Sequence, residues 1–113
     1  MVDISKGIEN CGSEEIYWEI IQTFCKDGHK RVKNIEDAVR VNDMSVFALE
    51  THSLKSVAAT IGAVELAAVA TTANRACKNN EINAVQEHGL KIIGLFRGVI
   101  DELEKKIDVF EKN

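Results

Sequence analysis

Two residues of this chain have types and a spacing that suit chemistry: His52 and Lys55. They lie three positions apart in a segment with helical periodicity, and side chains three positions apart are neighbours on a helix surface. Imidazole is a nucleophile when it is neutral, and its unperturbed pKa of about 6.5 leaves it largely neutral at pH 7. The pair therefore offers a nucleophile with a positive charge beside it.

The helix that carries His52 is expected to point the imidazole toward solvent. A helix turns about 100° per residue, and on this projection the apolar residues gather within roughly 60° of the side opposite His52. These residues are Phe47, Leu54, Val57, Ala58 and Ile61. They predict a buried stripe, with His52 on the exposed face. Glu50 falls on the buried side, so either the helix rotates slightly or Glu50 reaches a partner.

Small side chains surround the predicted position of His52. They are Ser45, Ala48, Ser56 and Ala59. With little bulk nearby, another protein could bring its own backbone close to the imidazole ring. Leu49 lies about 60° from His52 on the same projection. It belongs either to an apolar docking patch or to ordinary packing.

This segment resembles the signature of histidine phosphotransfer (HPt) domains. The family motif is His-x-Leu-Lys-Gly, then a small residue, Gly-Ala and Leu. The chain is similar to it in residues 52–56 (HSLKS), residues 61–63 (IGA) and Leu66. Further similarities extend over nearly the whole chain, at Asp3, in the acidic and aromatic stretch 14–24, and in the Asn-Asp pair 42–43.

The resemblance implies that His52 takes a phosphoryl group from an aspartate of one receiver domain and passes it to an aspartate of another. It implies that Lys55 neutralises phosphoryl oxygens. Mg²⁺ and the acidic pocket would come from the receiver, so this chain would bind no cofactor or metal of its own. Ser56 stands where the family usually has Gly, and Ala59 where a second Gly is common. Both are small, so close approach of a receiver survives.

Asn74 is a candidate to support this site from a second helix. Gly62 predicts a very short connection, so the helices on its two sides must be antiparallel. Folding back at Gly62 brings Asn74 and Arg75 alongside His52, with Lys78 one turn further. Any of these side chains could hydrogen-bond the imidazole or an attached phosphoryl group, or simply be exposed.

Other functional classes fit the sequence less well. The chain has no Gly-rich phosphate loop and no ATP-binding element, so we expect no enzyme or kinase activity of its own. The rest of a hybrid sensor histidine kinase is a further candidate partner. A di-iron bundle needs Glu three positions before His, and those positions hold Lys26, Leu49 and Val85. The alternative that stays open is a helical adaptor that docks a receiver domain without carrying phosphate.

Composition bounds the fold and the partners. The chain has 113 residues, 45% of them hydrophobic, and no proline, which favours one all-α domain over 1–113. A net charge of −4 argues against nucleic-acid binding. No apolar run approaches the roughly 20 residues of a membrane span, and the N-terminus has no secretory pattern. Three cysteines without metal or disulfide spacing suit a reducing cytoplasm, and we expect a monomer.

The fold predicted from these patterns is an antiparallel up-down four-helix bundle with one or two short extra N-terminal helices. Asp27-Gly28 predicts a break or a kink, which would separate N-terminal cap helices at about 3–27 from a bundle at about 28–110. Ile82 is expected to begin the apolar stripe of the last helix. The expected helices span residues 2–11, 14–26, 28–41, 43–61, 63–77 and 81–110.

Overall fold

The computed structural model describes residues 1–112, with the side chains of residues 1–109. Over this range the chain is helical and contains no strand, which confirms the predicted all-α class. No helix in the described range is long and apolar enough to cross a membrane. The helices are α1 (Ile4–Cys11), α2 (Glu14–Val41), α3 (Met44–Ile61), α4 (Val64–Lys78) and α5 (Ala84–Lys112).

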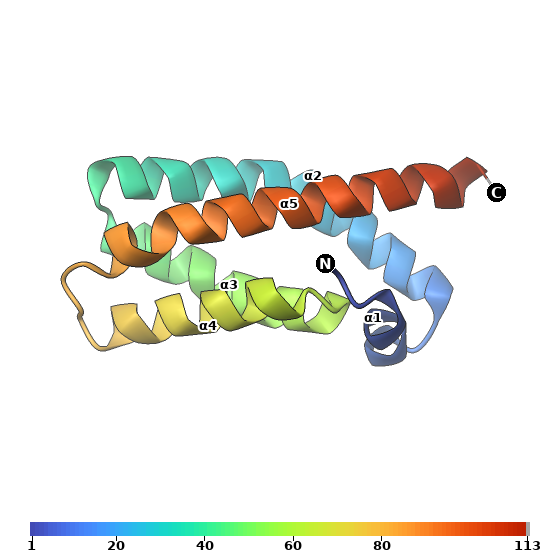
Figure 1. The fold of residues 1–113 in the computed structure, drawn as a ribbon, viewed down its shortest axis with the longest axis horizontal. Helices are drawn as coiled ribbons and strands as arrows, with labels where there is room; N and C mark the ends of the chain where they lie inside the picture. The colour runs from blue at the N-terminus through green and yellow to red at the C-terminus, as the bar shows by residue number, and fades with distance from the viewer. Residues whose placement is uncertain (113) are drawn as a thin grey trace.

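Four of these helices form the predicted up-down bundle. Helices α2 to α5 alternate in direction, with α2 packed along α5 and α3 packed along α4 (Figure 1). Helix α1 lies across the end of the bundle where α3 turns into α4, and it contacts both α2 and α3. The body measures 48 × 22 × 18 Å, so helices α2 and α5 set its long dimension.

Of the break or kink predicted at Asp27-Gly28, the break is wrong, because α2 runs without interruption through both residues. Gly28 is buried against α5, and a Cβ atom there would lie 2.8 Å from Cδ1 of Ile100. The glycine therefore permits close packing of two helices instead of ending one. Helix α2 passes continuously through the point where the cap helices were expected to end, and α1 is the single short extra helix within residues 1–112.

Capping side chains and a glycine define the ends of the helices. The backbone N–H of Ile16 donates to the Ser13 hydroxyl at 3.2 Å. The N–H of Val46 donates to Asp43 Oδ1 at 3.1 Å and so fixes the start of α3. Gly62 ends α3 with a φ of 87°, a left-handed conformation that suits glycine. Helix α4 begins two residues later, which makes α3 and α4 a tight antiparallel pair.

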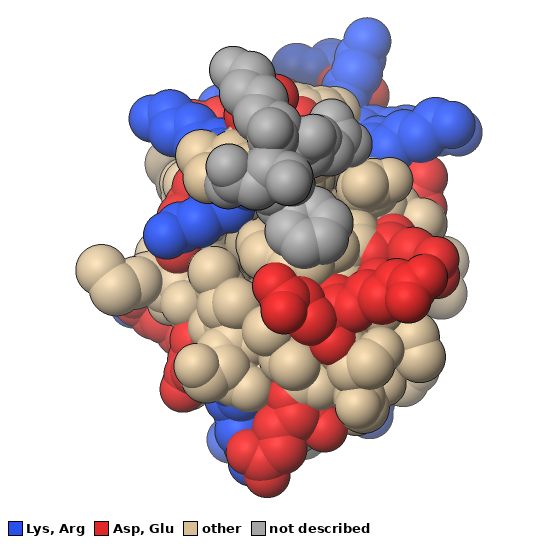
Figure 2. Space-filling view, turned by 90° about the vertical axis from the view of Figure 1, so that its right-hand side faces the viewer, with Lys and Arg blue, Asp and Glu red and all other residues tan. Residues whose placement is uncertain are grey.

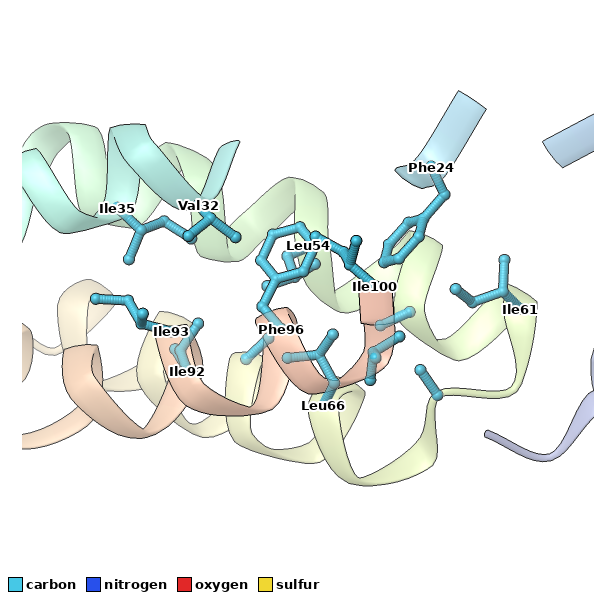
Figure 3. Packing of buried hydrophobic residues seen from close by; sticks show 14 of the residues in the cluster. Phe24, Val32, Ile35, Leu54, Ile61, Leu66, Ile92, Ile93, Phe96 and Ile100 are labelled. Carbon is cyan, nitrogen blue, oxygen red and sulfur yellow. The ribbon is translucent and has the colours of Figure 1, made fainter. Parts of the chain in front are cut away.

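The core lies between the two helix pairs. Figure 3 shows side chains of all four bundle helices meeting there, among them Phe24 and Phe96. The centres of these two rings are 5.5 Å apart. Phe47, Leu54, Ala58 and Ile61 are buried and Val57 is half-buried, which confirms the predicted stripe of α3. Ile82 is an exception, since it precedes α5 and is 80% exposed.

The N-terminal segment is fastened to the end of α3. The backbone N–H of Asp3 donates to the carbonyl of Gly62 at 2.8 Å, and the Asn10 amide donates to the carbonyl of Thr60 at 3.2 Å. Figure 2 shows this end of the molecule, where acidic side chains gather across the middle of the surface. These bonds hold the α3–α4 turn in place and so fix the helix that carries His52.

Candidate functional site

Helix α3 presents His52 to solvent near its middle. The side chain is exposed, while Phe47, Leu54 and Ala58 on the opposite side are buried, as predicted. Among the described residues, none has a side chain within hydrogen-bonding distance of the imidazole. Both ring nitrogens are therefore open to another molecule, on a helix that the core holds rigid.

Lys55 lies one turn beyond His52 and is half-buried. Its ammonium group donates a 3.2 Å hydrogen bond to Oδ1 of Asn74 on α4. Residues three apart on a helix have Cβ atoms about 5–6 Å apart, so the Lys55 and His52 side chains are neighbours. Of this predicted pair, Lys55 is also tied to a second helix through Asn74.

Asn74 occupies the place expected of it but has different partners. It is 3% exposed, so it is not a surface residue. Its Nδ2 donates to the carbonyl of Ala48 at 3.0 Å and to Oγ1 of Thr51 at 3.2 Å. Its Oδ1 accepts from Lys55. The amide therefore reaches the cation of the site rather than the imidazole, since none of its hydrogen bonds goes to His52.

Thr51 is a site residue that the sequence reasoning missed. It is fully buried, and its hydroxyl lies 3.2 Å from the carbonyl of Ala48 as well as accepting from Asn74. A signal was available, because Ala48, Thr51 and Lys55 recur at steps of three and four and so share one side of the helix. That side faces α4 at the position of Asn74.

The surroundings of His52 are open, as the small side chains predicted. Ser56 and Ala59 are exposed and Ala48 is half-buried. Leu49 is 69% exposed, so it does not serve ordinary core packing. Arg75 on α4 is exposed as well. The surface around the imidazole therefore consists of small side chains together with the large apolar side chain of Leu49.

Glu50 reaches a partner instead of entering the core. One carboxylate oxygen lies 3.4 Å from Nη1 of Arg31, and the other accepts from Nδ2 of Asn34 at 3.3 Å. Both partners belong to α2, so this carboxylate joins α3 to its other neighbour. Glu50 on the buried side of the helix is therefore explained by its partners on α2 and not by a rotation of the helix.

Comparison with protein-family models gives a match that spans most of the chain. The model described as "Hpt domain" matches residues 19–108, which include the whole of α3 and α4 and most of α2 and α5. Searches among curated proteins and among solved structures give no significant match. Domains of this family serve histidine phosphotransfer in phosphorelays as phosphocarrier modules that lack a catalytic core. The match covers well over half of the chain, and the chain therefore belongs to the Hpt domain family.

Proposed function

We propose that this protein carries a phosphoryl group on His52 between the aspartates of two receiver domains. The observation that carries the proposal is the exposed imidazole in the middle of a core-anchored helix, with the Lys55 ammonium one turn away. Membership of the Hpt domain family supports histidine phosphotransfer, but it does not identify the histidine that carries the phosphoryl group. The assignment of receiver domains as the donor and the acceptor is also part of this proposal.

The two other histidines are less suited to the role. His29 Nε2 lies 2.9 Å from Oε2 of Glu104, so a carboxylate occupies one of its nitrogens. A negative charge beside an imidazole would also repel a phosphoryl group. His88 on α5 is half-buried, next to Val69 and Lys91 in a surface hollow. Only for His52 do exposure, free ring nitrogens and an adjacent cation held by hydrogen bonding coincide among the described residues.

Each step of the proposed transfer forms one bond and breaks one bond. A lone pair on one imidazole nitrogen of His52 attacks the phosphorus of an aspartyl phosphate. The N–P bond forms, and the P–O bond to the aspartate breaks, so that the carboxylate leaves with the electron pair. The second step reverses these roles on another receiver. Phosphoryl transfer depends chiefly on positioning and charge neutralisation, which Lys55 and a Mg²⁺ ion on the receiver would supply.

The low relief around His52 suits the approach of a receiver. An aspartate that is held in a pocket must come within bonding distance of the imidazole, which requires small neighbours on this chain. Ser56, Ala59 and Ala48 meet that requirement. Leu49 offers an apolar contact at the edge of the same face. We assign these four residues to receiver docking.

A transfer assay with separate histidine variants tests the proposal. A receiver domain carrying labelled phosphate and Mg²⁺ is mixed with wild type, His52→Gln, His29→Gln or His88→Gln. We expect acid-labile, base-stable label on all but His52→Gln. Label on His52→Gln would show that another residue is the carrier. No label on wild type, across several receivers that it binds, would favour an adaptor that docks receivers without carrying phosphate.

A further inference from the structure

Two buried polar side chains lie directly beneath the proposed site. Thr51 and Asn74 are the buried polar residues among those described, apart from aromatic and cysteine side chains. Both touch the carbonyl of Ala48, and Asn74 also touches Lys55. Buried polar groups are costly unless they are hydrogen-bonded, so their placement beneath Lys55, one helical turn from His52, calls for a physical explanation.

The orientation of the Asn74 amide follows from the groups around it. The carbonyl of Ala48 can only accept, so the amide must turn its NH₂ group toward Ala48, at 3.0 Å. The ammonium of Lys55 can only donate, so it must meet the amide oxygen, at 3.2 Å. A flipped amide would oppose donor to donor at one end and acceptor to acceptor at the other. The contacts therefore permit one orientation.

Thr51 strengthens this orientation. Its hydroxyl proton points to the carbonyl of Ala48, at 3.2 Å, which leaves an oxygen lone pair for the second N–H of Asn74, also at 3.2 Å. In a regular helix the Ala48 carbonyl also accepts from the backbone N–H of His52, four residues on. The cluster of Thr51, Asn74 and Ala48 thus ties α4 to the helical turn that bears His52.

The hydrogen bond to Asn74 holds the Lys55 ammonium group in place and leaves it able to donate further hydrogen bonds. A lysine side chain has four rotatable bonds and normally samples many positions. Here one of its three N–H donors is engaged by Asn74. The two others have no hydrogen-bond partner among the described residues. The ammonium is thereby held beside the His52 turn, with two donors left for an incoming group.

We infer that Asn74, oriented by Thr51 and the Ala48 carbonyl, is a positioning residue that holds the Lys55 ammonium ready for the phosphoryl oxygens on His52. The inference rests on the proposed function and deepens it. Asn74 touches neither the imidazole nor the transferred group, and it acts through Lys55. Preorganised charge needs no rearrangement when the phosphoryl group arrives, and so lowers the barrier to transfer.

The test is a double-mutant cycle on the transfer rate from a phosphorylated receiver. We expect Asn74→Ala to slow transfer about tenfold in the wild-type background. In a Lys55→Met background, the same change is expected to alter the rate less than about twofold, because the cation that it positions is gone. If Asn74→Ala reduced the transfer rate by the same factor in both backgrounds, or in neither, the inference would be overturned.

Matched variants separate positioning from folding. Thr51→Val keeps the side-chain shape and removes the hydroxyl, so it is expected to slow transfer in the same direction even if Asn74→Ala folds poorly. Its control is Thr71→Val, whose hydroxyl bonds only within α4, to the carbonyl of Ala67. The control for Asn74→Ala is Asn10→Ala, which breaks another contact between helices but none to Lys55. Equal rates for Thr51→Val and Thr71→Val would contradict the inference.

A second measurement needs no receiver. The ¹⁵N relaxation of the Lys55 ammonium, assigned by its loss in Lys55→Met, is expected to report restricted motion of Nζ in wild type and greater motion in Asn74→Ala. Equal mobility of Nζ in wild type and in Asn74→Ala would overturn the inference by itself. Failure of the proposed function can be told apart from failure of this inference, because in the first case the wild-type protein is never labelled. Labelled wild type with an equal rate for Asn74→Ala overturns the inference alone.

Discussion

The hydroxyl of Tyr17 donates a 2.8 Å hydrogen bond to the main-chain carbonyl of Ile61. Tyr17 belongs to α2 and is fully buried, and Ile61 is the last residue of α3. Carbonyls in the last turn of a helix lack partners within the helix. A side chain from another helix therefore completes the end of α3, at the point where the chain turns into α4.

Tyr17→Phe is expected to destabilise the protein by about 1–3 kcal/mol, because it leaves a buried carbonyl without its donor. Urea unfolding monitored by circular dichroism measures the change. Transfer to His52 should be unaffected below the unfolding range, since the His52 side chain lies more than two helical turns away from Ile61. An unchanged free energy of unfolding would show that another donor can replace the phenol.

Alkaline pH is expected to weaken the fold through the same residue. Burial raises the pKa of Tyr17 to about 12, against about 10 for an ordinary tyrosine. The unfolded chain therefore loses the proton first, so the stabilising contribution is complete below about pH 10 and declines as the pH rises toward 12. The measurement is the free energy of unfolding from pH 9 to 12. Wild type should fall more steeply than Tyr17→Phe, and parallel curves would contradict the assignment.

Gly62→Ala and Gly12→Ala form a matched pair. Both glycines end helices with positive φ, 87° and 94°, so alanine at either position pays the left-handed penalty of about 1–2 kcal/mol. At Gly62 the added Cβ would also overlap the main-chain oxygen of Asp3, whereas at Gly12 nothing lies within 4 Å. We expect Gly62→Ala to cost about 4 kcal/mol or more. Equal unfolding midpoints for the two variants would show that the N-terminal segment is not fastened there.

Three glycines of α5 should respond to alanine in opposite ways. Gly94 and Gly98 have open space where a Cβ would stand, so Gly94→Ala and Gly98→Ala are each expected to stabilise the helix by about 1 kcal/mol. At Gly89 a Cβ would overlap the side chain of Val39, so Gly89→Ala should destabilise. Thermal unfolding of the three variants measures the signs. Stabilisation by Gly89→Ala would mean that α2 and α5 can separate at no cost.

Bulk at Ser56 tests the docking face. Ser56→Gly is expected to leave transfer intact or to speed it, and Ser56→Gln to slow it by about tenfold through hindered approach. Ala68→Gln is the control, because Ala68 is exposed on α4 beside His88 and Lys91 of α5, not beside α3. Circular dichroism confirms that each variant folds. Equal transfer rates for Ser56→Gln and wild type would place the docking face elsewhere.

The sequence was sufficient for the features that depend on one helix at a time. The apolar stripe of α3 settled that His52 points outward, and Gly62 settled the antiparallel return of α4. The caps at Ser13 and Asp43 are local in the same sense, because capping joins residues three positions apart. These features need only local geometry, which a repeating pattern encodes.

Features that depend on two helices were less accessible. The sequence could not decide whether the helix breaks at Gly28, because that depends on Ile100, seventy-two positions away, which fills the space beside it. Asn74 was placed beside the site, but its choice of Lys55 over His52 depends on side-chain reach and on the acceptor at Ala48. Glu50 found Arg31 for the same kind of reason. Periodicity identifies a face and does not identify the atoms that meet it.

The hydrogen bonds among Thr51, Lys55 and Asn74 have a consequence for evolution. Asn74 forms a hydrogen bond with each of the other two residues, so replacing one residue leaves an unmatched group on its neighbour. A single change at any of the three positions is therefore expected to be selected against, even though the other two are intact. Among related chains these positions should vary as a set, with the record of substitutions at 74 predicting those at 51 and 55.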